Sequence, residues 1–427
     1  MAKVLLIGSG GREHALVWKL LQSPLAKKIY VAPGNGGTGT IAENVPIKAT
    51  DIPALLSFAR EKKIDLVVVG PDDPLALGIV DEFQNAGIPI FGPAKKAAEL
   101  EASKAFAKSF MDAHGIPTAR FKVFREFEKA DEYLKGGEMK FPAVVKASGL
   151  ALGKGVTIAH TYEEAETALH QAMIDRIFGP SGETVVIEEF LEGREISIHA
   201  ISEGVTFKLF PTAQDHKRIF DGDQGPNTGG MGTIAPVPWI TDANLKEIET
   251  KIVEPTLRGM NEEDRPFTGI LYPGLMMTKN GPKVLEFNAR FGDPETQSYM
   301  RLLKTDLVEI IQSCVEGKLK DRKIEWHPGY ATCVVLASGG YPGNYEKGKK
   351  ITGIEDAERI EGVCVFHAGT VYENGSYYTS GGRVLGVSAI GNTLKEALDK
   401  AYEGVKKINF EGMQYRKDIG ARSLRGA

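Results

Sequence analysis

Lys146-Ala147-Ser148-Gly149-Leu150-Ala151-Leu152-Gly153-Lys154-Gly155 is a glycine-rich loop between two short apolar segments. Four strand-like segments and one helical pattern surround it, with the strands at 141–147, 155–159, 184–189 and 195–202 and the helix at 162–175. Antiparallel strands with helices to one side indicate an α+β domain in this part of the chain.

The loop only superficially matches a P-loop. Three residues separate Gly149 from Gly153, Gly155 stands where a Ser or Thr is required, and a strand follows where a helix should. A glycine-rich flap between antiparallel strands is a different device, which closes over phosphates and excludes water. Lys146, on the strand before the flap, would then reach an α- or β-phosphate. The alternative is an ordinary hairpin with solvated lysines.

A buried strand at 185–191 leads into the two carboxylates Glu188 and Glu189. Its backbone can pair with an adenine edge while apolar side chains enclose the ring. Glu195, a few residues on, is placed to accept from ribose hydroxyls. The alternative is a charged strand end that faces water.

The segment Glu286-Phe287-Asn288-Ala289-Arg290 alternates with the period of a strand, so Glu286 and Asn288 share a face while Phe287 enters the core. A carboxylate and an amide oxygen side by side suit Mg²⁺ shared with nucleotide phosphates, and Arg290 on the same face would stabilise transferring charge. The alternative is a satisfied polar strand face. For Asp293, a helix N-cap role competes with substrate binding.

The first hundred residues alternate short apolar runs with helical patterns, which predicts a parallel sheet covered by helices. The expected strands are 3–8, 29–32, 65–70 and 88–92, with helices near 12–22 and 74–85. Gly8-Ser9-Gly10-Gly11 follows the first strand, where backbone N–H groups can hold a phosphate. Glu13 replaces the third glycine of a dinucleotide fingerprint, and no acidic residue follows the second strand. A tight turn that needs glycine for geometry alone is the alternative.

Later segments carry fewer chemical groups. Asp215, beside cations at the end of another strand, is placed to hold a substrate ammonium, and His216 has no second histidine at metal-ligand spacing. The stretch 221–238 lacks apolar periodicity and is expected to be a long loop. A strand at 331–337 and a helix at 393–408 indicate a third, smaller domain.

Composition narrows the function classes. The chain has 427 residues and a formal net charge of −4, so nucleic acid is a disfavoured partner. Its three cysteines form no C-x-x-C pair, and no apolar stretch is long enough to cross a bilayer or resembles a secretion signal. A cytoplasmic protein of two to four domains, without membrane contact, is expected.

The order of the motifs (flap lysine, adenine strand, then E-x-N) resembles the ATP-grasp superfamily across about 103–303. The chain is similar above all to the phosphoribosylamine–glycine ligase family of purine biosynthesis. The motifs that carry this resemblance are Gly8-Ser-Gly-Gly-Arg-Glu-His14, Pro33-Gly-Asn-Gly-Gly-Thr38, Gln214-Asp-His-Lys-Arg218, Pro226-Asn-Thr-Gly-Gly-Met-Gly232 and Arg290-Phe-Gly-Asp-Pro-Glu295. It implies an N-terminal parallel α/β domain at 1–102, a central ATP-grasp domain at 103–325 with a mobile lid at about 120–190, and a small C-terminal α+β domain at 326–427.

The resemblance also implies a role for each candidate residue. Lys146 and Arg290 would be catalytic, and Glu286 and Asn288 would hold Mg²⁺ or Mn²⁺. The residues implied for ATP are Lys104, Lys146, Gly149, Gly153, Lys154, Gly155, Glu188, Glu189, Phe190, Leu191 and Glu195. Those implied for glycine and 5-phosphoribosylamine are Gly10, Gly11, Gly34, Asn35, Gly36, Asp215, Lys217, Arg290 and Asp293. Many ATP-grasp enzymes carry another acidic ligand on the preceding strand, and 272–277 has none.

The implied reaction ligates glycine to 5-phosphoribosylamine through glycyl phosphate, and gives glycinamide ribonucleotide, ADP and phosphate. A monomer or small homo-oligomer is expected. Three alternatives stay open from the sequence: a different carboxylate–amine ligase on the same scaffold, a nicotinamide-dependent oxidoreductase, and a nucleotide-binding regulator without catalysis.

Overall fold

The computed structural model describes residues 1–150 and 155–425. The N-terminal region is a parallel sheet in the order β3-β2-β1-β4-β5. Its strands are β1 (Ala2–Gly8), β2 (Ala26–Pro33), β3 (Glu43–Asn44), β4 (Leu66–Val69) and β5 (Ile90–Phe91). The helices are α1 (Gly11–Leu20), α2 (Thr38–Ile41), α3 (Ile52–Lys62), α4 (Asp72–Leu77), α5 (Ile79–Asn85) and α6 (Lys95–Ala102). Because β1 alternates between two apolar clusters, both faces of the sheet are covered, and the predicted parallel α/β sheet is confirmed.

One predicted helix of this region is wrong in its extent. The pattern at 74–85 was expected to form a single helix, and the structure has two, α4 and α5. They are separated by Gly78, whose φ of 95° lies in the left-handed region that ends helices. Sequence reasoning also did not identify α3, which begins at an Asp51 cap.

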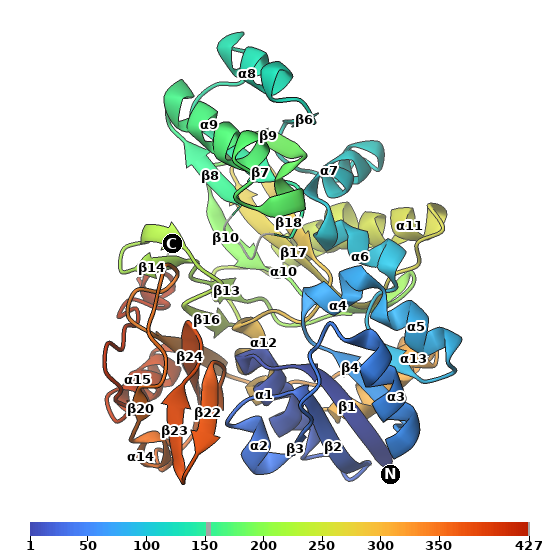
Figure 1. Cartoon of the computed structure of the whole chain (residues 1–427), viewed down its shortest axis with the longest axis vertical. Helices are drawn as coiled ribbons and strands as arrows, with labels where there is room; N and C mark the ends of the chain where they lie inside the picture. The colour runs from blue at the N-terminus through green and yellow to red at the C-terminus, as the bar shows by residue number, and fades with distance from the viewer. Residues whose placement is uncertain (151–154, 426–427) are drawn as a thin grey trace.

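The lid is an antiparallel sheet in the order β6-β9-β7-β8, and it projects from the rest of the molecule (Figure 1). It contains β6 (Phe121–Phe124), β7 (Ala143–Ala147), β8 (Val156–Ala159) and β9 (Val185–Glu189). Helices α8 (Phe127–Lys135) and α9 (Tyr162–Leu169) pack on this sheet through a core of its own. The α+β character predicted for this part of the chain is confirmed.

Below the lid, a second sheet is built around β17 (Thr268–Thr278), which pairs with β18 (Gly281–Asn288), β10 (Arg194–Ser197) and β11 (Ala200–Glu203). β12 (Thr206–Leu209) completes it, and α7 (Lys104–Ala113), α10 (Asp242–Ile248) and α11 (Glu254–Glu262) contribute to its apolar core. The single strand expected at 195–202 is two strands. The ladder register places Ile198 opposite Pro273, which has no N–H to donate, so the pairing is interrupted there.

The C-terminal sheet has the order β13-β16-β19-β24-β21. Its strands are β13 (Gln214–Asp215), β16 (Gly232–Ala235), β19 (Tyr330–Ala337), β21 (Val363–His367) and β24 (Arg383–Gly391). A small sheet contains β20 (Lys350–Ile351), β22 (Thr370–Glu373) and β23 (Ser376–Thr379). Its helices are α12 (Glu295–Leu302), α14 (Ile354–Glu358), α15 (Leu394–Val405) and α16 (Ala421–Leu424), whereas α13 (Leu307–Val315) packs against β5, β11 and β17.

The expectation of a continuous loop at 221–238 is wrong in part. β14 (Arg218–Phe220) pairs with β15 (Gln224–Asn227), and β16 lies inside the stretch. Backbone pairing with neighbouring strands overrides the low strand propensity of Gly, Pro and Asn here. Since β13 and β16 pair into the C-terminal sheet, this sheet crosses the proposed domain boundary at 326, and the boundary stays a proposal.

Candidate active site

Lys146 lies where three strands meet. It projects from β7, and its Nζ is 3.0 Å from Glu188 Oε1 on β9. The same Nζ donates to the carbonyl of Leu285 on β18, at 3.0 Å. Leu285 precedes Glu286 in the chain, so one ammonium group joins β7, β9 and β18, the strand with the candidate metal ligands.

Glu188 has a second cationic partner, which sequence reasoning missed. Lys108 Nζ, on α7, lies 3.0 Å from Glu188 Oε2 and donates to Thr118 Oγ1 at 2.7 Å. Both side chains of this pair are 2% exposed, and burial lowers the pKa of Lys108 to about 8. The Glu188 carboxylate therefore lies between two lysines, and its backbone is paired with β6 on one side and β7 on the other. The spacing of Lys108 one helical turn after Lys104 was the available signal.

The end of β9 and the residues after it, predicted to bind adenine, present an apolar surface beside charged groups. Glu189 accepts from the Arg120 N–H at 3.0 Å and from Lys283 Nζ at 3.1 Å. Phe190 is 37% exposed. Leu191 packs in a small apolar cluster with Ala119, Met276 and Leu285. This cluster is the wall against which a flat ring can stack.

The described ends of the flap are fixed to the lid. The Gly155 carbonyl accepts from Ala147, and Gly149 donates to the Ser181 carbonyl at 3.1 Å. A Cβ on Gly149 would lie 2.5 Å from Ser181 Oγ, so this close approach requires glycine. Lys104 Nζ donates to the Gly149 carbonyl at 3.1 Å, and burial lowers its pKa. Gly153 and Lys154 lie outside the described residues.

Glu286 and Asn288 are arranged as oxygen ligands. Lys217 Nζ is 3.2 Å from Glu286 Oε1 and 3.6 Å from Glu195 Oε2. Chiefly because of Lys217, the pKa of Glu286 falls to about 2, so the carboxylate stays ionised. Asn288 Oδ1 accepts from Arg290 at 3.0 Å. These two hard oxygen donors fit a divalent cation that takes further oxygens from a phosphate.

No larger metal cluster accompanies them. Within residues 1–150 and 155–425, no group of three or more His, Cys, Asp or Glu side chains is placed to hold a metal ion. Gly274, which pairs with Glu286 on the preceding strand, has no side chain to add a ligand. Any cation here therefore depends on its substrate for most of its coordination.

Arg290 is anchored beside Glu286 and Asn288 by an ion pair with Glu101. Its Nη2 lies 3.1 Å from Glu101 Oε1, and Glu101 also accepts from the Ala289 N–H at 2.7 Å. Burial raises the pKa of Glu101 to about 7, although Arg290 opposes the shift. In the described structure, the buried Nε of Arg290 has no hydrogen-bond partner. An arginine with an unused donor suits the recognition of an anionic group.

Asp215 lies close to a glycine. A Cβ on Gly230 would come within 2.6 Å of Asp215 Oδ1 and 2.5 Å of the Pro294 ring, so a side chain at 230 would displace both. Loss of surrounding water raises the pKa of Asp215 well above its ordinary range, and the nearby Glu295 raises it further. A cationic ligand would counter that shift.

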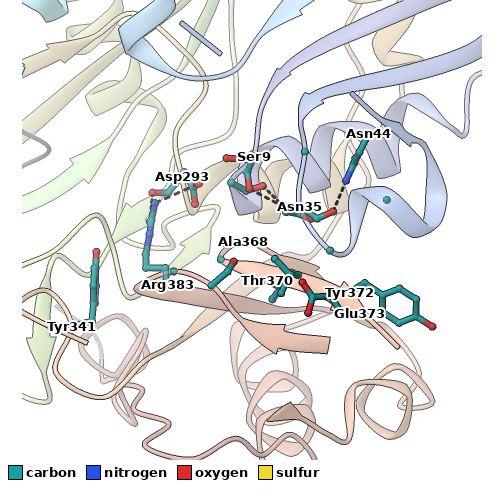
Figure 2. A pocket seen from close by; sticks show the side chains of 18 residues that line it. Ser9, Asn35, Asn44, Asp293, Tyr341, Ala368, Thr370, Tyr372, Glu373 and Arg383 are labelled. Atoms are coloured by element: carbon teal, nitrogen blue, oxygen red, sulfur yellow. Dashed lines mark hydrogen bonds and ion pairs between the residues drawn. The ribbon is translucent and has the colours of Figure 1, made fainter. Parts of the chain in front are cut away.

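A cavity of about 730 Å³ opens between the N-terminal and C-terminal regions (Figure 2). From the N-terminal loops it is lined by Ser9, Gly10, Gly34, Asn35 and Gly36, and Asp293 also reaches it. Gly11 does not line it, because the position of a Gly11 Cβ falls 2.6 Å from Gln297 Nε2.

The sequence analysis did not predict the residues that form the opposite wall of this cavity. That wall includes Thr370, Ser380 and Arg383. Arg383 donates to the carbonyls of Gly229 at 2.6 Å and Asp293 at 2.7 Å, and it lies 3.4 Å from the Asp293 carboxylate. The glycine-rich run 380–383, ending in an arginine, was the available signal for an anion site.

The loops on the two sides of this cavity are joined. Asn35 Nδ2 donates to the His367 carbonyl at 2.8 Å, and the Gly36 N–H donates to the Thr370 carbonyl at 2.9 Å. His14 Nδ1 accepts from the His367 N–H at 2.7 Å. Burial lowers the pKa of His14 to about 3 and that of His367 to about 4. This side of the site is therefore assembled from segments more than 300 residues apart.

The comparisons with known proteins agree with this layout. Models of the phosphoribosylglycinamide synthetase N domain, ATP-grasp (A) domain and C domain match residues 2–101, 102–296 and 331–422. The chain is 52% identical to a phosphoribosylamine–glycine ligase of Caldanaerobacter subterraneus subsp. tengcongensis, over 98% of this chain and 99% of the relative. It is 49% identical to the ligase of that name from Chlorobaculum tepidum, over 99% of this chain and 100% of the relative.

A crystal structure of the phosphoribosylamine–glycine ligase of Thermotoga maritima is also similar. It has a TM-score of 0.85 and 38% identity, and the match covers 98% of this chain and all of that one. The predicted fold, with an N-terminal parallel sheet, a central ATP-grasp region and a C-terminal domain, is confirmed. The chain belongs to the phosphoribosylglycinamide synthetase family, whose members are ATP-grasp ligases of purine biosynthesis that act as phosphoribosylamine–glycine ligases.

Proposed function

We propose that the chain binds ATP between the lid and β18, and joins glycine to 5-phosphoribosylamine where that cleft meets the 730 Å³ cavity. The observation that carries this proposal is the position of Lys146. Its ammonium group contacts both the Glu188 carboxylate and the carbonyl next to Glu286. Only a phosphate chain that passes between the lid and β18 can use all three strands at once.

In the first proposed step, a carboxylate oxygen of glycine attacks the γ-phosphorus of ATP. The bond to the β-phosphate oxygen breaks, which gives glycyl phosphate and ADP. Lys146 and Lys104 hold the phosphate chain, and Arg290 neutralises charge on the transferring group. Asp215 receives the ammonium of glycine, and Lys217 keeps Glu286 ionised and in place.

In the second step, the amine of phosphoribosylamine attacks the acyl carbon. The C–O bond to phosphate breaks, phosphate leaves, and the amine proton passes to solvent or to the leaving phosphate. The glycine loops that contain Gly10 and Gly36 and the guanidinium of Arg383 line the cavity, and they are proposed to receive the ribosyl phosphate there. Flap closure is proposed to keep water from the acyl phosphate.

Glu286 and Asn288 are the proposed residues for a divalent cation, which would neutralise the phosphates when bound. Mg²⁺ is the proposed ion, with Mn²⁺ as the alternative, since both accept oxygen ligands. For the oligomeric state we propose a monomer or small homo-oligomer. A cytoplasmic location is supported by three buried cysteines without disulfides among the described residues. No helix in the described part of the chain is both long and apolar enough to span a bilayer.

The test is phosphate release from ATP, with glycine and phosphoribosylamine supplied separately and together. We expect stoichiometric ADP, phosphate and glycinamide ribonucleotide only when both are present. Replacement of glycine by alanine or by bicarbonate is the matched control, and it should give no product. Equal turnover with another carboxylate would overturn the glycine assignment.

A further inference from the structure

The strand that carries two proposed substrate contacts has a second, opposite face. β13 covers only Gln214 and Asp215, but the side-chain contacts along 214–217 alternate between two sides of the segment. Lys217 lies on the site-facing side with Asp215, where its Nζ contacts Glu286. Gln214 and His216 therefore project the other way, and the mechanism proposed above does not use them.

The segment 416–423, between α15 and the end of α16, covers that opposite face. The Gly420 N–H donates to His216 Nε2 at 3.1 Å. Ser423 Oγ donates to Gln214 Oε1 at 3.0 Å, and Gln214 Nε2 in turn donates to the Glu195 carbonyl at 3.0 Å. Both outward side chains of the strand are thus hydrogen-bonded to one segment some 200 residues later in the chain.

A buried arginine anchors this segment. Arg416 is 1% exposed, its Nη1 lies 2.7 Å from Asp223 Oδ1, and its Nε lies 2.8 Å from Asp418 Oδ1. Its Nη1 also donates to the Arg218 carbonyl at 3.2 Å. These contacts fix the segment to the β14–β15 hairpin, which follows β13 in the chain.

His216 is suited to a positioning role. Its Nδ1 lies 3.0 Å from the Gly232 carbonyl, so the proton belongs on Nδ1 and Nε2 is free to accept from Gly420. Burial, with a contribution from Arg416, lowers the pKa of His216 to about 4. The ring therefore stays neutral, and it keeps the same two hydrogen bonds through the neutral pH range.

We infer that the 416–423 segment positions the strand that presents Asp215 and Lys217, with His216, Gln214 and Ser423 as positioning residues. This rests on the proposed roles of Asp215 and Lys217. It assigns to the C-terminal region a contribution to the glycine end of the site, in addition to the wall it gives the cavity. A misplacement of Asp215 by a fraction of an ångström weakens binding of the small glycine ammonium more than that of the many-contact ATP.

The experiment compares full-length His216→Ala, His216→Gln, Ser423→Ala and Thr352→Val. Thr352→Val is the control, since it removes one C-terminal hydrogen bond, to the Asn409 carbonyl, away from the strand. We expect His216→Ala to raise the KM for glycine about tenfold, because it removes both hydrogen bonds of the buried ring. His216→Gln, which retains an acceptor for Gly420, should restore most of this loss. Affinity for ATP should match that of Thr352→Val in every variant.

Ser423→Ala keeps the test decisive if His216→Ala does not fold, because it removes only a hydroxyl group. It should raise the KM for glycine severalfold with an unchanged melting temperature. A KM for glycine equal to the wild-type value in both His216→Ala and Ser423→Ala would overturn the inference. Wild-type protein that forms no ADP with glycine and phosphoribosylamine would instead overturn the proposed function.

Discussion

The two ends of the proposed site are built differently. At the ATP end, charged side chains already face one another: Glu188 lies between two lysines, and Glu286 lies against Lys217. At the phosphoribosylamine end, the cavity is lined largely by glycine loops, and its two walls come from opposite ends of the chain. The ATP end therefore depends on side chains carried by strands, and the phosphoribosylamine end depends on how loops distant in the sequence pack together.

This difference determines which substitutions should matter. Removal of one charge at the ATP end leaves its partner charge uncompensated, which is costly in a partly buried cleft. At the cavity, the lining is spread over several loops and one arginine, so a single substitution there should have a milder effect. The predictions below test that ranking.

The largest effect is expected at Glu286. Glu286→Ala should lower the rate of ADP formation by about a thousandfold or more, because it removes a proposed metal ligand and leaves Lys217 without its nearest carboxylate. The measurement is glycine-dependent ADP release at saturating substrates. Asp399→Ala, which removes an exposed carboxylate from α15, is the control and should keep the wild-type rate. Near-normal turnover of Glu286→Ala would remove the metal assignment.

The sequence was informative about the ATP end for a physical reason. In a strand, every second side chain points to the same face of the sheet. Glu286 and Asn288 could therefore be assigned to one face and Phe287 to the core, where Phe287 is 3% exposed. Lys108 was missed because its partner Glu188 is 80 residues away, and no local pattern links a helix lysine to a distant carboxylate.

At the cavity, local patterns found only half of the site. Gly10, Gly34 and Gly36 follow strands of a parallel sheet, whose carboxyl ends predict a ligand edge. Arg383 follows no such rule, since its place depends on how the C-terminal sheet packs against the N-terminal loops. The interrupted ladder at Ile198 was likewise invisible, because it requires knowing which residue lies opposite.

A smaller effect is expected at Arg383. Arg383→Ala should lower kcat/KM for phosphoribosylamine by about 30- to 100-fold, since it removes an anion-binding charge and frees the Gly229 and Asp293 carbonyls. Affinity for ATP should be unchanged. Arg383→Lys should be intermediate, because a point charge cannot span both carbonyls. An equal loss of ATP affinity would show that the two ends are not independent.

The smallest effect on activity is expected from a change of pH. Acid should protonate the histidines beside the cavity, whereas the Glu286 carboxylate at the ATP end should stay ionised. His14 and His367 titrate near pH 6.5 when unfolded, but their folded pKa values are about 3 and about 4. The unfolded state therefore binds more protons between pH 4 and 6.5, and stability is full above pH 6.5 and lost as the pH falls. Each ring contributes up to about 1.4 kcal/mol per pH unit.

Urea unfolding at pH 7.5, 6.5 and 5.5 measures this loss, and His367→Asn should reduce the slope below pH 6.5. The ring of His367 contacts Thr370, which lines the cavity, so protonation of His367 should weaken the wall that is proposed to receive phosphoribosylamine. Glu286, with a pKa of about 2, remains ionised throughout this range, and ATP affinity should hold at pH 5.5. If ATP affinity fell together with stability, the contact between His14 and His367 would also control the ATP cleft. The two ends of the site would then not be independent.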